Sequence, residues 1–356
     1  MKRIGMKHIL IECCMLLAVG SIYLYSIWGV EAVNSGNAVQ EEEEEAYIKW
    51  VEFNVTYEAL QRAYDLDVES YDSEVHLNWI EMLAYLGAKY GGDFSRYSRS
   101  DLDSLAEVLT SGEETIETLT ASMEYYNYYA EAYDAVLGGL IGEYEVETSV
   151  EGDADSNETE WVHKYGLKAF SPVAKGYSYT DFDDFGVSRS YGYQRNHLGH
   201  DMMGLVGTPI VAVESGYVEV LGWNQYGGWR IGVRSFDGKR YYYYAHLRQN
   251  FPFKKSLEEG SVVTAGEVIG YMGHTGYSTK ENVNNIDETH LHWGLQLIFD
   301  ESQKEGNNEI WVDCYALTRF LSQNRSETWK EEETKEYHRT YDMKDPAVEE
   351  FEKNQN

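Results

Sequence analysis

The C-terminal half of the sequence consists of short β-prone runs separated by glycine-containing turns. From Phe170 onward no helical pattern of 10–15 residues interrupts these runs, which argues against the βαβ units of a parallel sheet. We therefore expect a mainly antiparallel β domain over residues 167–322. Its expected strands are Ile210–Glu214, Tyr217–Leu221, Trp229–Arg234, Lys239–Ala245, Val262–Val263, Glu267–Met272 and Leu291–Phe299.

Residues 47–146 have the periodicity of helices. One apolar stripe, with spacings of 3, 4, 3 and 4, runs from Trp50 to Tyr64, and a longer one runs from Ile116 to Leu140. Further apolar residues lie beside the longer stripe, so the buried face is wide. This width favours a small helical bundle over an isolated coiled coil. The predicted fold class is thus multidomain α + β, with a helical bundle and an antiparallel β domain.

Acidic stretches flank the bundle. Residues 31–46 include the run Glu41–Glu45, and residues 147–166 begin with another polar, acidic sequence. Like-charge blocks of this kind are typical of solvated linkers, and we interpret both stretches in that way. Residues 323–356 are also charged, and we expect them to form a loose helical tail.

The N-terminus has the pattern of a membrane signal-anchor. Three basic residues, Lys2, Arg3 and Lys7, precede the run Cys13–Val30, which holds no charge in 18 residues. As a helix the run would measure roughly 27 Å, close to the ~30 Å hydrocarbon core of a bilayer. The positive-inside rule then predicts a cytoplasmic start, a single transmembrane helix within residues 1–30, and an extracytoplasmic body. The alternative is a cleaved signal peptide and a secreted protein.

Charge and cysteine content exclude several classes of protein. The chain carries 29 Lys and Arg against 61 Asp and Glu, a formal net charge of −32, which would repel nucleic-acid phosphates. We therefore expect no nucleic-acid partner. Beyond the N-terminal run only Cys314 remains, which excludes a disulfide scaffold and a cysteine-based zinc finger.

Histidines mark the candidate site. Six of the ten lie between residues 197 and 292, most of them near turns of the β region. His290 and His292 are two residues apart, so in a strand both side chains point to the same face. His197 and Asp201 add an imidazole and a carboxylate. Imidazole and carboxylate ligands without thiolate suit a catalytic zinc site, in which three protein ligands leave a position for water.

The order of these residues resembles the lysostaphin/LytM-type zinc endopeptidases, which cut peptides of bacterial peptidoglycan. The resemblance covers about residues 167–320. It rests on an H-x-x-x-D motif (His197 to Asp201), a single histidine in Tyr244-Ala-His246, and an H-x-H motif (His290 to His292). Gly207-Thr208-Pro209 and the segment Gly273–Ser278 fit the same pattern.

The resemblance implies one zinc ion per catalytic domain, held by His197, Asp201 and His292. It assigns His246 and His290 as the general base and acid that also stabilise the tetrahedral intermediate, and it reads His200 as a residue that does not bind metal. The family also uses a tyrosine before the first ligand; Tyr191 and Tyr193 both lie near that place, and the alternatives stay open.

The implied function is hydrolysis of peptide bonds in peptidoglycan by a membrane-anchored zinc metalloendopeptidase. Two rivals remain: a regulatory family member without activity, and a wall-binding or channel scaffold of a sporulation, secretion or conjugation apparatus. In either case the helical bundle could bind a protein partner.

Overall fold

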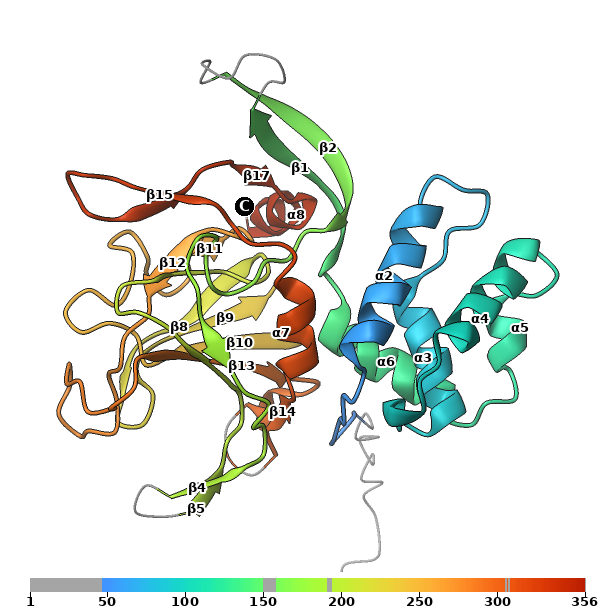
Figure 1. Ribbon diagram of the computed structural model, residues 1–356, viewed down its shortest axis with the longest axis horizontal. Helices are drawn as coiled ribbons and strands as arrows, with labels where there is room; N and C mark the ends of the chain where they lie inside the picture. Colours follow the sequence, from blue (N-terminus) through green and yellow to red (C-terminus); the bar gives the residue numbers. More distant parts are fainter. Residues whose placement is uncertain (1–46, 150–157, 191–193, 305, 307, 356) are drawn as a thin grey trace, which may run out of the picture. The chain divides into compact units, whose positions relative to one another are not determined.

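The computed structural model of the chain describes residues 47–149, 158–190, 194–304, 306 and 308–355. The predicted signal-anchor and the acidic linker at 31–46 lie outside these residues. From Tyr47 onward the chain forms one compact unit, in which helices come first and strands follow (Figure 1). None of the helices in the described part is long and apolar enough to cross a membrane.

The N-terminal helices form around capping residues. Thr56 precedes α2 and its hydroxyl accepts a hydrogen bond from the Ala59 amide at 3.3 Å, so the helix begins after Trp50 and Phe53 and not at them. Gly91 ends α3 in the left-handed conformation, with φ of 65°. The helices are α2 (Tyr57–Ser70), α3 (Trp79–Tyr90), η1 (Phe94–Arg96), α4 (Arg99–Ser111), α5 (Ile116–Thr120) and α6 (Tyr126–Leu137).

The spacing of the stripe from Ile116 to Leu140 is that of one continuous helix, but the structure has two helices there. α5 ends at Thr120 and α6 begins at Tyr126, and the residues between them form turns, with the Met123 amide donating to the Thr120 carbonyl at 2.8 Å. The break preserves the apolar spacing because both short helices still bury one face in the bundle. Helical periodicity therefore predicted the buried positions but not the interruption.

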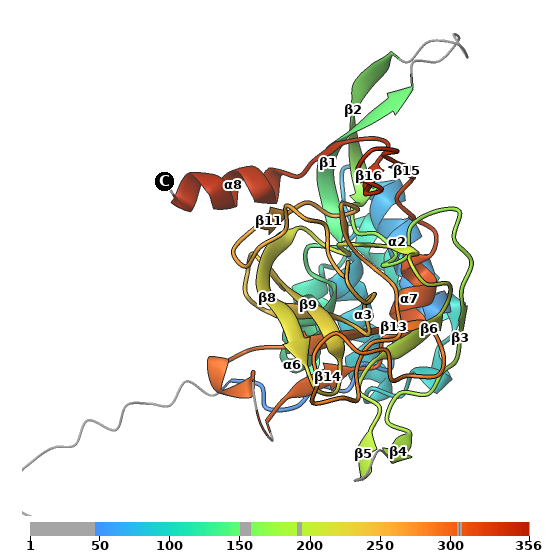
Figure 2. The same ribbon diagram turned by 90° about the vertical axis from the view of Figure 1, so that its left-hand side faces the viewer.

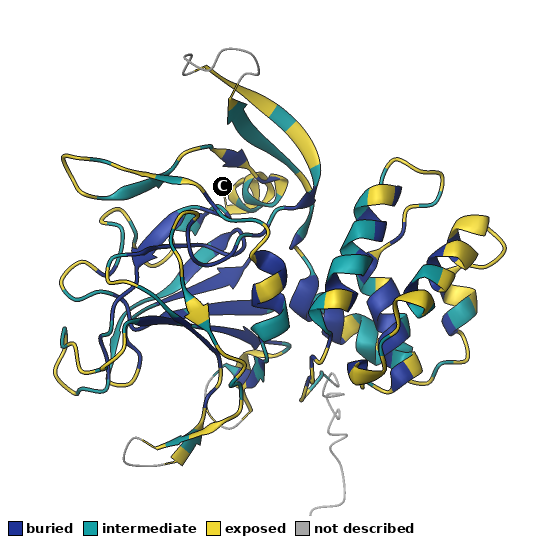
Figure 3. Cartoon of the chain, in the orientation of Figure 1, coloured by how far each residue is buried: buried dark blue, intermediate teal, exposed yellow. Residues whose placement is uncertain are grey.

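Eight strands make the main sheet, and every pair in it is antiparallel, as expected from the sequence. Its path runs β11-β8-β9-β10-β13-β6-β3, and β14 also pairs with β13. The bounds are β3 (Thr180–Asp181), β6 (His200–Met203), β8 (Gly216–Asn224), β9 (Gly228–Ser235), β10 (Arg240–Ala245), β11 (Val262–Val263), β13 (His290–Leu297) and β14 (Ile310–Val312). Figure 3 shows β10 and β13 as mostly buried strands.

Smaller elements surround this sheet. β7 (Pro209–Val211) pairs with β12 (Val268–Tyr271), and β4 (Ser188–Ser190) pairs with β5 (Gln194–Asn196) in a hairpin that projects from the rest in both views (Figure 2). The short helices η2 (Glu301–Gln303) and α7 (Tyr315–Leu321) follow the sheet strands β13 and β14.

Two predictions about the segments flanking the β domain are wrong. Residues 147–166 are not simply a linker, because β1 (Ile141–Ser149) and β2 (Thr159–Leu167) pair over nine residues on each strand. In β1 acidic residues alternate with apolar ones, a pattern that fits a half-exposed hairpin and that charge content alone concealed. The C-terminal segment is helical only in α8 (Pro346–Gln355). Before it lie β15 (Thr328–Lys330), β16 (Tyr337–Arg339) and β17 (Met343–Lys344), and β17 pairs with β1.

Helices and sheet share one continuous core. Phe320 of α7 is fully buried, and its ring lies 5.4 Å from Tyr64 of α2 and 5.7 Å from Trp79 of α3. Arg240 of β10 is also buried and reaches the carbonyls of Asp134 and Ala135 in α6. The helical segment therefore contributes to the surroundings of the sheet that carries the histidines.

Candidate metal centre

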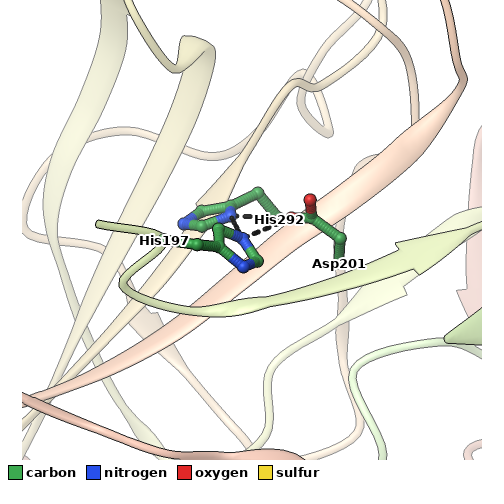
Figure 4. A group of neighbouring side chains, drawn as sticks. All are labelled: His197, Asp201 and His292. Carbon is green, nitrogen blue, oxygen red and sulfur yellow. Dashed lines mark hydrogen bonds and ion pairs between the residues drawn. The ribbon is translucent and has the colours of Figure 1, made fainter. Parts of the chain in front are cut away.

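Strand pairing brings the three predicted ligands together. β6 and β13 are neighbours, and their register places Asp201 directly opposite His292. Residues directly opposite each other on antiparallel strands point to the same face. His197 lies just after β5, four residues before Asp201. The short turn through Gly199 returns its imidazole to the same point, as Figure 4 shows.

The ligand atoms are close to one another. His197 Nε2 lies 3.0 Å from Asp201 Oδ1 and 3.0 Å from His292 Nδ1, and His292 Nδ1 lies 2.8 Å from Asp201 Oδ1. Among the residues that the structure describes, these three are the only group of His, Cys, Asp or Glu side chains that converges closely enough to hold a metal ion. The structure thus places the predicted ligands together as a group.

Outer contacts orient this group. Asp184 Oδ1 lies 3.0 Å from His197 Nδ1, the ring nitrogen that faces away from the cluster. Arg189 donates to Asp201 Oδ2 at 2.7 Å and also pairs with Asp184. One guanidinium therefore ties together the carboxylate of the cluster and the carboxylate that orients His197, an arrangement typical of metal sites.

The donor set fits a cation. When the proton of neutral His197 sits on Nδ1, where Asp184 accepts it, Nε2 presents a lone pair towards the Asp201 carboxylate at 3.0 Å. Two acceptors at this distance repel unless a positive charge lies between them. Arg189, which donates to Asp201 Oδ2 at 2.7 Å, favours the ionised form of this carboxyl group. Asp201 is thus a carboxylate, the form that binds metal, and the cluster suits zinc better than Mg²⁺, which prefers oxygen ligands.

His246 lies beside the cluster in a left-handed backbone conformation, with φ of 61°. This conformation is uncommon for a residue other than glycine and is often found at functional sites. His246 Nδ1 lies 3.0 Å from the Thr275 carbonyl. A carbonyl only accepts, so the proton resides on Nδ1 and Nε2 is left as a free base.

His290 is held in a similar way. Its Nδ1 lies 2.8 Å from the Glu288 carbonyl, and its Nε2 lies 3.8 Å from Asp201 Oδ2. The rings of His246 and His290 are 4.8 Å apart. Burial, and then the neighbouring imidazoles His290 and His292, lower the pKa of His246 well below its usual value, so this ring is neutral near pH 7. Both predicted catalytic histidines therefore lie beside the ligand cluster with an acceptor nitrogen available.

A cavity of about 410 Å³ opens over this site. His197, His246 and His292 line it, together with Tyr243 and Tyr277, whereas His290 does not. Its volume is in the range of sites that bind small molecules or peptide segments.

Not every predicted residue can be placed. Tyr191 and Tyr193 lie outside the described residues, so the choice between them stays a prediction. His200 is next to Asp201 on β6 and points to the opposite face, where its Nε2 lies 3.0 Å from Asp181. This position agrees with the prediction that His200 does not bind metal.

Three further residues of the site were not predicted from the sequence: Asp184, Arg189 and Gly199. The first two act on the ligands from a loop and a hairpin whose paths no motif indicates. Gly199 had a signal, because it lies within the H-x-x-x-D motif. A Cβ atom there would come within 2.6 Å of the His292 ring and 2.9 Å of the Trp293 carbonyl, so only glycine fits without displacing a neighbour.

Comparisons with known proteins agree with this site. Residues 195–305 match peptidase family M23, which includes all five histidine and aspartate positions described above. The chain is 34% identical over 200 residues to an L-Ala–D-Glu endopeptidase of Bacillus subtilis, a match that covers 56% of this chain and 55% of that protein. It is 34% identical over 139 residues to the glycyl-glycine endopeptidase ALE-1 of Staphylococcus capitis, covering 38% of this chain and 33% of that protein.

Among solved structures, the catalytic domain of lysostaphin from Staphylococcus simulans is 28% identical, with a TM-score of 0.31. That match covers 40% of this chain and 92% of the other. The chain spans about half the length of the Bacillus relative and a smaller share of the Staphylococcus capitis one.

Proposed function

Residues 195–305 of this chain belong to peptidase family M23, of the lysostaphin/LytM type, and on that premise we propose that the protein is a zinc metalloendopeptidase that hydrolyses peptide bonds in peptidoglycan. The observation that carries the proposal is the convergence of His197, Asp201 and His292 on one point, next to two histidines whose Nε2 atoms are free. Both relatives described above are endopeptidases, and this supports the proposed reaction class.

The chain's own residues supply binding and proton transfer. When bound by His197, Asp201 and His292, zinc would activate a water molecule and polarise the scissile carbonyl. His246, neutral and with its proton fixed on Nδ1 by Thr275, accepts a proton at Nε2. The same proton can then pass to the leaving amine. His290, whose ring lies 4.8 Å from that of His246, is positioned to share this role.

The roles of ligand and base are separated by two substitutions. His292→Ala should lose zinc and nearly all activity. His246→Asn should keep zinc and the fold, because asparagine tolerates the left-handed conformation of this position. Its rate should nevertheless fall about 10²–10⁴-fold, as is usual when a positioned base is removed.

Three measurements on purified residues 47–356 test these expectations: zinc content by mass spectrometry, circular dichroism, and muropeptides released from isolated peptidoglycan. Full zinc occupancy in His292→Ala would refute the ligand assignment. Wild-type protein that holds zinc but releases no muropeptide would refute the enzyme and favour the scaffold.

We also propose that the run Cys13–Val30 anchors the protein in the cell membrane with its peptidase segment outside. The proposal rests on the uncharged length of the run and on the basic residues before it. Fractionation of cells that express the whole chain tests it. Protein in the membrane fraction that retains Met1 would support the anchor, whereas shortened protein in the medium would show that the signal is cleaved.

A further inference from the structure

The cleft over the metal centre is lined by cations, although the chain as a whole is strongly acidic. Arg189, Arg195, Arg230 and Lys304 line it, against the single carboxylate of Glu309. Most of these cations already have partners in the fold. Arg189 binds Asp184 and Asp201, Lys304 binds Glu219 at 2.5 Å, and Arg195 contacts Tyr277.

Arg230 differs from the other three. In the described part of the chain its guanidinium forms no ion pair, and its Nε is buried without a hydrogen-bond partner. A buried donor left unpaired costs about 1–3 kcal/mol, which a protein seldom retains without a reason. Because Arg230 lines the cleft, an anionic ligand that enters the cleft could bind its guanidinium without displacing a carboxylate of the fold.

The sheet places Arg230 on the same face as the metal cluster. On β9, the residue after Arg230 is Ile231, which pairs with Tyr244 on the opposite face. Gly232, the next residue on the Arg230 face, pairs with Tyr243, which lines the cleft. β9, β10 and β13 are consecutive strands, so Arg230 lies two strands, about 10 Å, from the strand of His292. An extended peptide covers about 3.3 Å per residue, so this distance corresponds to roughly three residues.

Two tyrosines complete the surroundings of Arg230. Tyr241 and Tyr243 alternate with Tyr242 on β10 and both line the cleft. Glycines leave room for them, since a Cβ at Gly232 would lie 2.0 Å from the Tyr241 hydroxyl and one at Gly227 would lie 2.2 Å from the Tyr243 hydroxyl. Burial raises the pKa of both tyrosines, and the nearby charge of Arg230 opposes that rise, so both hydroxyls stay protonated. A guanidinium flanked by aromatic hydroxyls is a suitable site for a carboxylate.

We propose that Arg230 binds a free carboxylate of the peptide substrate, so that the enzyme selects acidic stem peptides over uncharged bridges such as oligoglycine. This inference rests on the proposed peptidase function and deepens it. Because the carboxylate would lie within about three residues of the cleaved bond, Arg230 sets specificity without taking part in the proton transfer at His246.

The test compares two peptides that differ only in charge. One is a peptidoglycan stem peptide with free carboxylates, and the other is the same peptide with those carboxylates converted to carboxamides. Wild-type residues 47–356 should cleave the acidic peptide with a kcat/KM about 10–100-fold higher, the range expected for one hydrogen bond between charged groups. Arg230→Gln should reduce this ratio to about twofold, chiefly by lowering kcat/KM for the acidic peptide. Arg230→Lys should retain part of the preference.

Lys254→Gln is the matched control, because this lysine pairs with Glu267 at 3.2 Å and does not line the cleft. It should behave as the wild type. Equal cleavage of both peptides by the wild type, or a preference that survives in Arg230→Gln, would overturn the inference and leave the peptidase function intact.

A binding measurement separates the two proposals. In the slow His246→Asn variant, calorimetry should show tighter binding of the acidic peptide, and adding Arg230→Gln should remove the difference. This result would support carboxylate binding by Arg230 even if turnover were too slow to measure. Absence of both zinc and cleavage in the wild type would instead count against the peptidase function. Equal binding of both peptides would count against carboxylate binding by Arg230.

Discussion

At the scale of single residues, the candidate metal centre requires a glycine next to its ligands, because no larger residue fits there. Gly199 faces the ring of His292, and a Cβ there would come within 2.7 Å of Nε2 as well as 2.6 Å of Cε1. Contacts this short do not occur between real atoms, so alanine must push the ring of His292 away from Asp201. Because metal affinity depends on how the ligands are oriented, the displacement should weaken zinc binding.

We therefore predict that Gly199→Ala lowers zinc affinity about 10–100-fold, the range seen when the support of a ligand is disturbed. Competition with a chelator of known affinity measures this effect. Gly142→Ala on β1 is the control, because its Cβ would meet only Lys168 at an ordinary 3.5 Å. Unchanged zinc affinity in Gly199→Ala would show that His292 does not hold the metal in the orientation seen here.

Buried imidazoles also predict how stability depends on pH. Burial lowers the pKa of His246 and of His292, so both stay neutral in the fold at pH values where the unfolded chain, with a histidine pKa of about 6.5, takes up protons. The folded state then loses stability as the pH falls below about 6.5.

In metal-free protein, the free energy of unfolding should fall by about 1.4 kcal/mol between pH 7.5 and 5.5 for His246 alone, with a further decrease from His292. Urea unfolding in the presence of a chelator measures it. His246→Asn should show a shallower dependence than the wild type. Equal slopes in the two proteins would mean that His246 is protonated in the fold.

At the scale of elements, motifs predicted the candidate ligands because the spacing of two residues along a strand determines whether their side chains point to the same face. His290 and His292 had to share a face, and the resemblance supplied the partner segments that the register of β6 and β13 then aligned. Asp184 carried no such signal, since its contact with His197 depends on the path of a loop. Arg230 likewise gave no signal, because the absence of any described carboxylate beside its guanidinium depends on the fold and cannot be seen in the sequence.

Boundaries of elements were predicted less well for a related reason. β1 and β2 read as an acidic linker because exposed hairpins carry as much charge as linkers do. Residues 323–356 contain few apolar positions, yet Met343 is buried against β1 through β17. In both cases pairing between strands decided the structure, and pairing leaves no helical periodicity in the sequence.

Arg240 joins two elements and should be costly to remove. Its guanidinium binds Glu214 and Asp237 on the β side and the carbonyls of Asp134 and Ala135 at the end of α6. Burial would lower its pKa, but Glu214 outweighs that effect, so the guanidinium stays charged. Removing the cation leaves Glu214 buried with the Tyr242 hydroxyl, at 2.6 Å, as its remaining side-chain donor.

Arg240→Met should therefore lower the free energy of unfolding by about 3–5 kcal/mol, as breaking one side of a buried ion pair usually does. Lys239→Met is the matched control. It removes a neighbouring cation that pairs with Asp134, but at the surface, where such pairs contribute about 1 kcal/mol or less. Denaturant unfolding compares them, and similar losses in the two variants would contradict the role assigned to Arg240.

At the scale of the whole molecule, the shared core argues that the β domain does not fold well by itself. Phe320 packs against Tyr64 and Trp79 of the helices, and Gln303 donates to the Ile48 carbonyl at 2.7 Å. Deleting residues 47–160 would expose these surfaces and remove the α6 carbonyls from Arg240. The helical segment is thus part of the structural support of the sheet that carries His292 and Asp201.

We predict that residues 47–356 unfold in one cooperative transition and that the fragment 161–356 melts at least about 6 °C lower. Exposing even two large apolar side chains costs about 3–6 kcal/mol, and 1 kcal/mol shifts the melting temperature of a chain of this size by about 2–4 °C. Calorimetry of both proteins decides the question. Two separate transitions in the longer protein, one at the temperature of the fragment, would show that helices and sheet are independent domains. A single transition would mean that the helices must be retained when activity is assayed, because a weakened sheet would displace His292 and Asp201 before any chemistry could be measured.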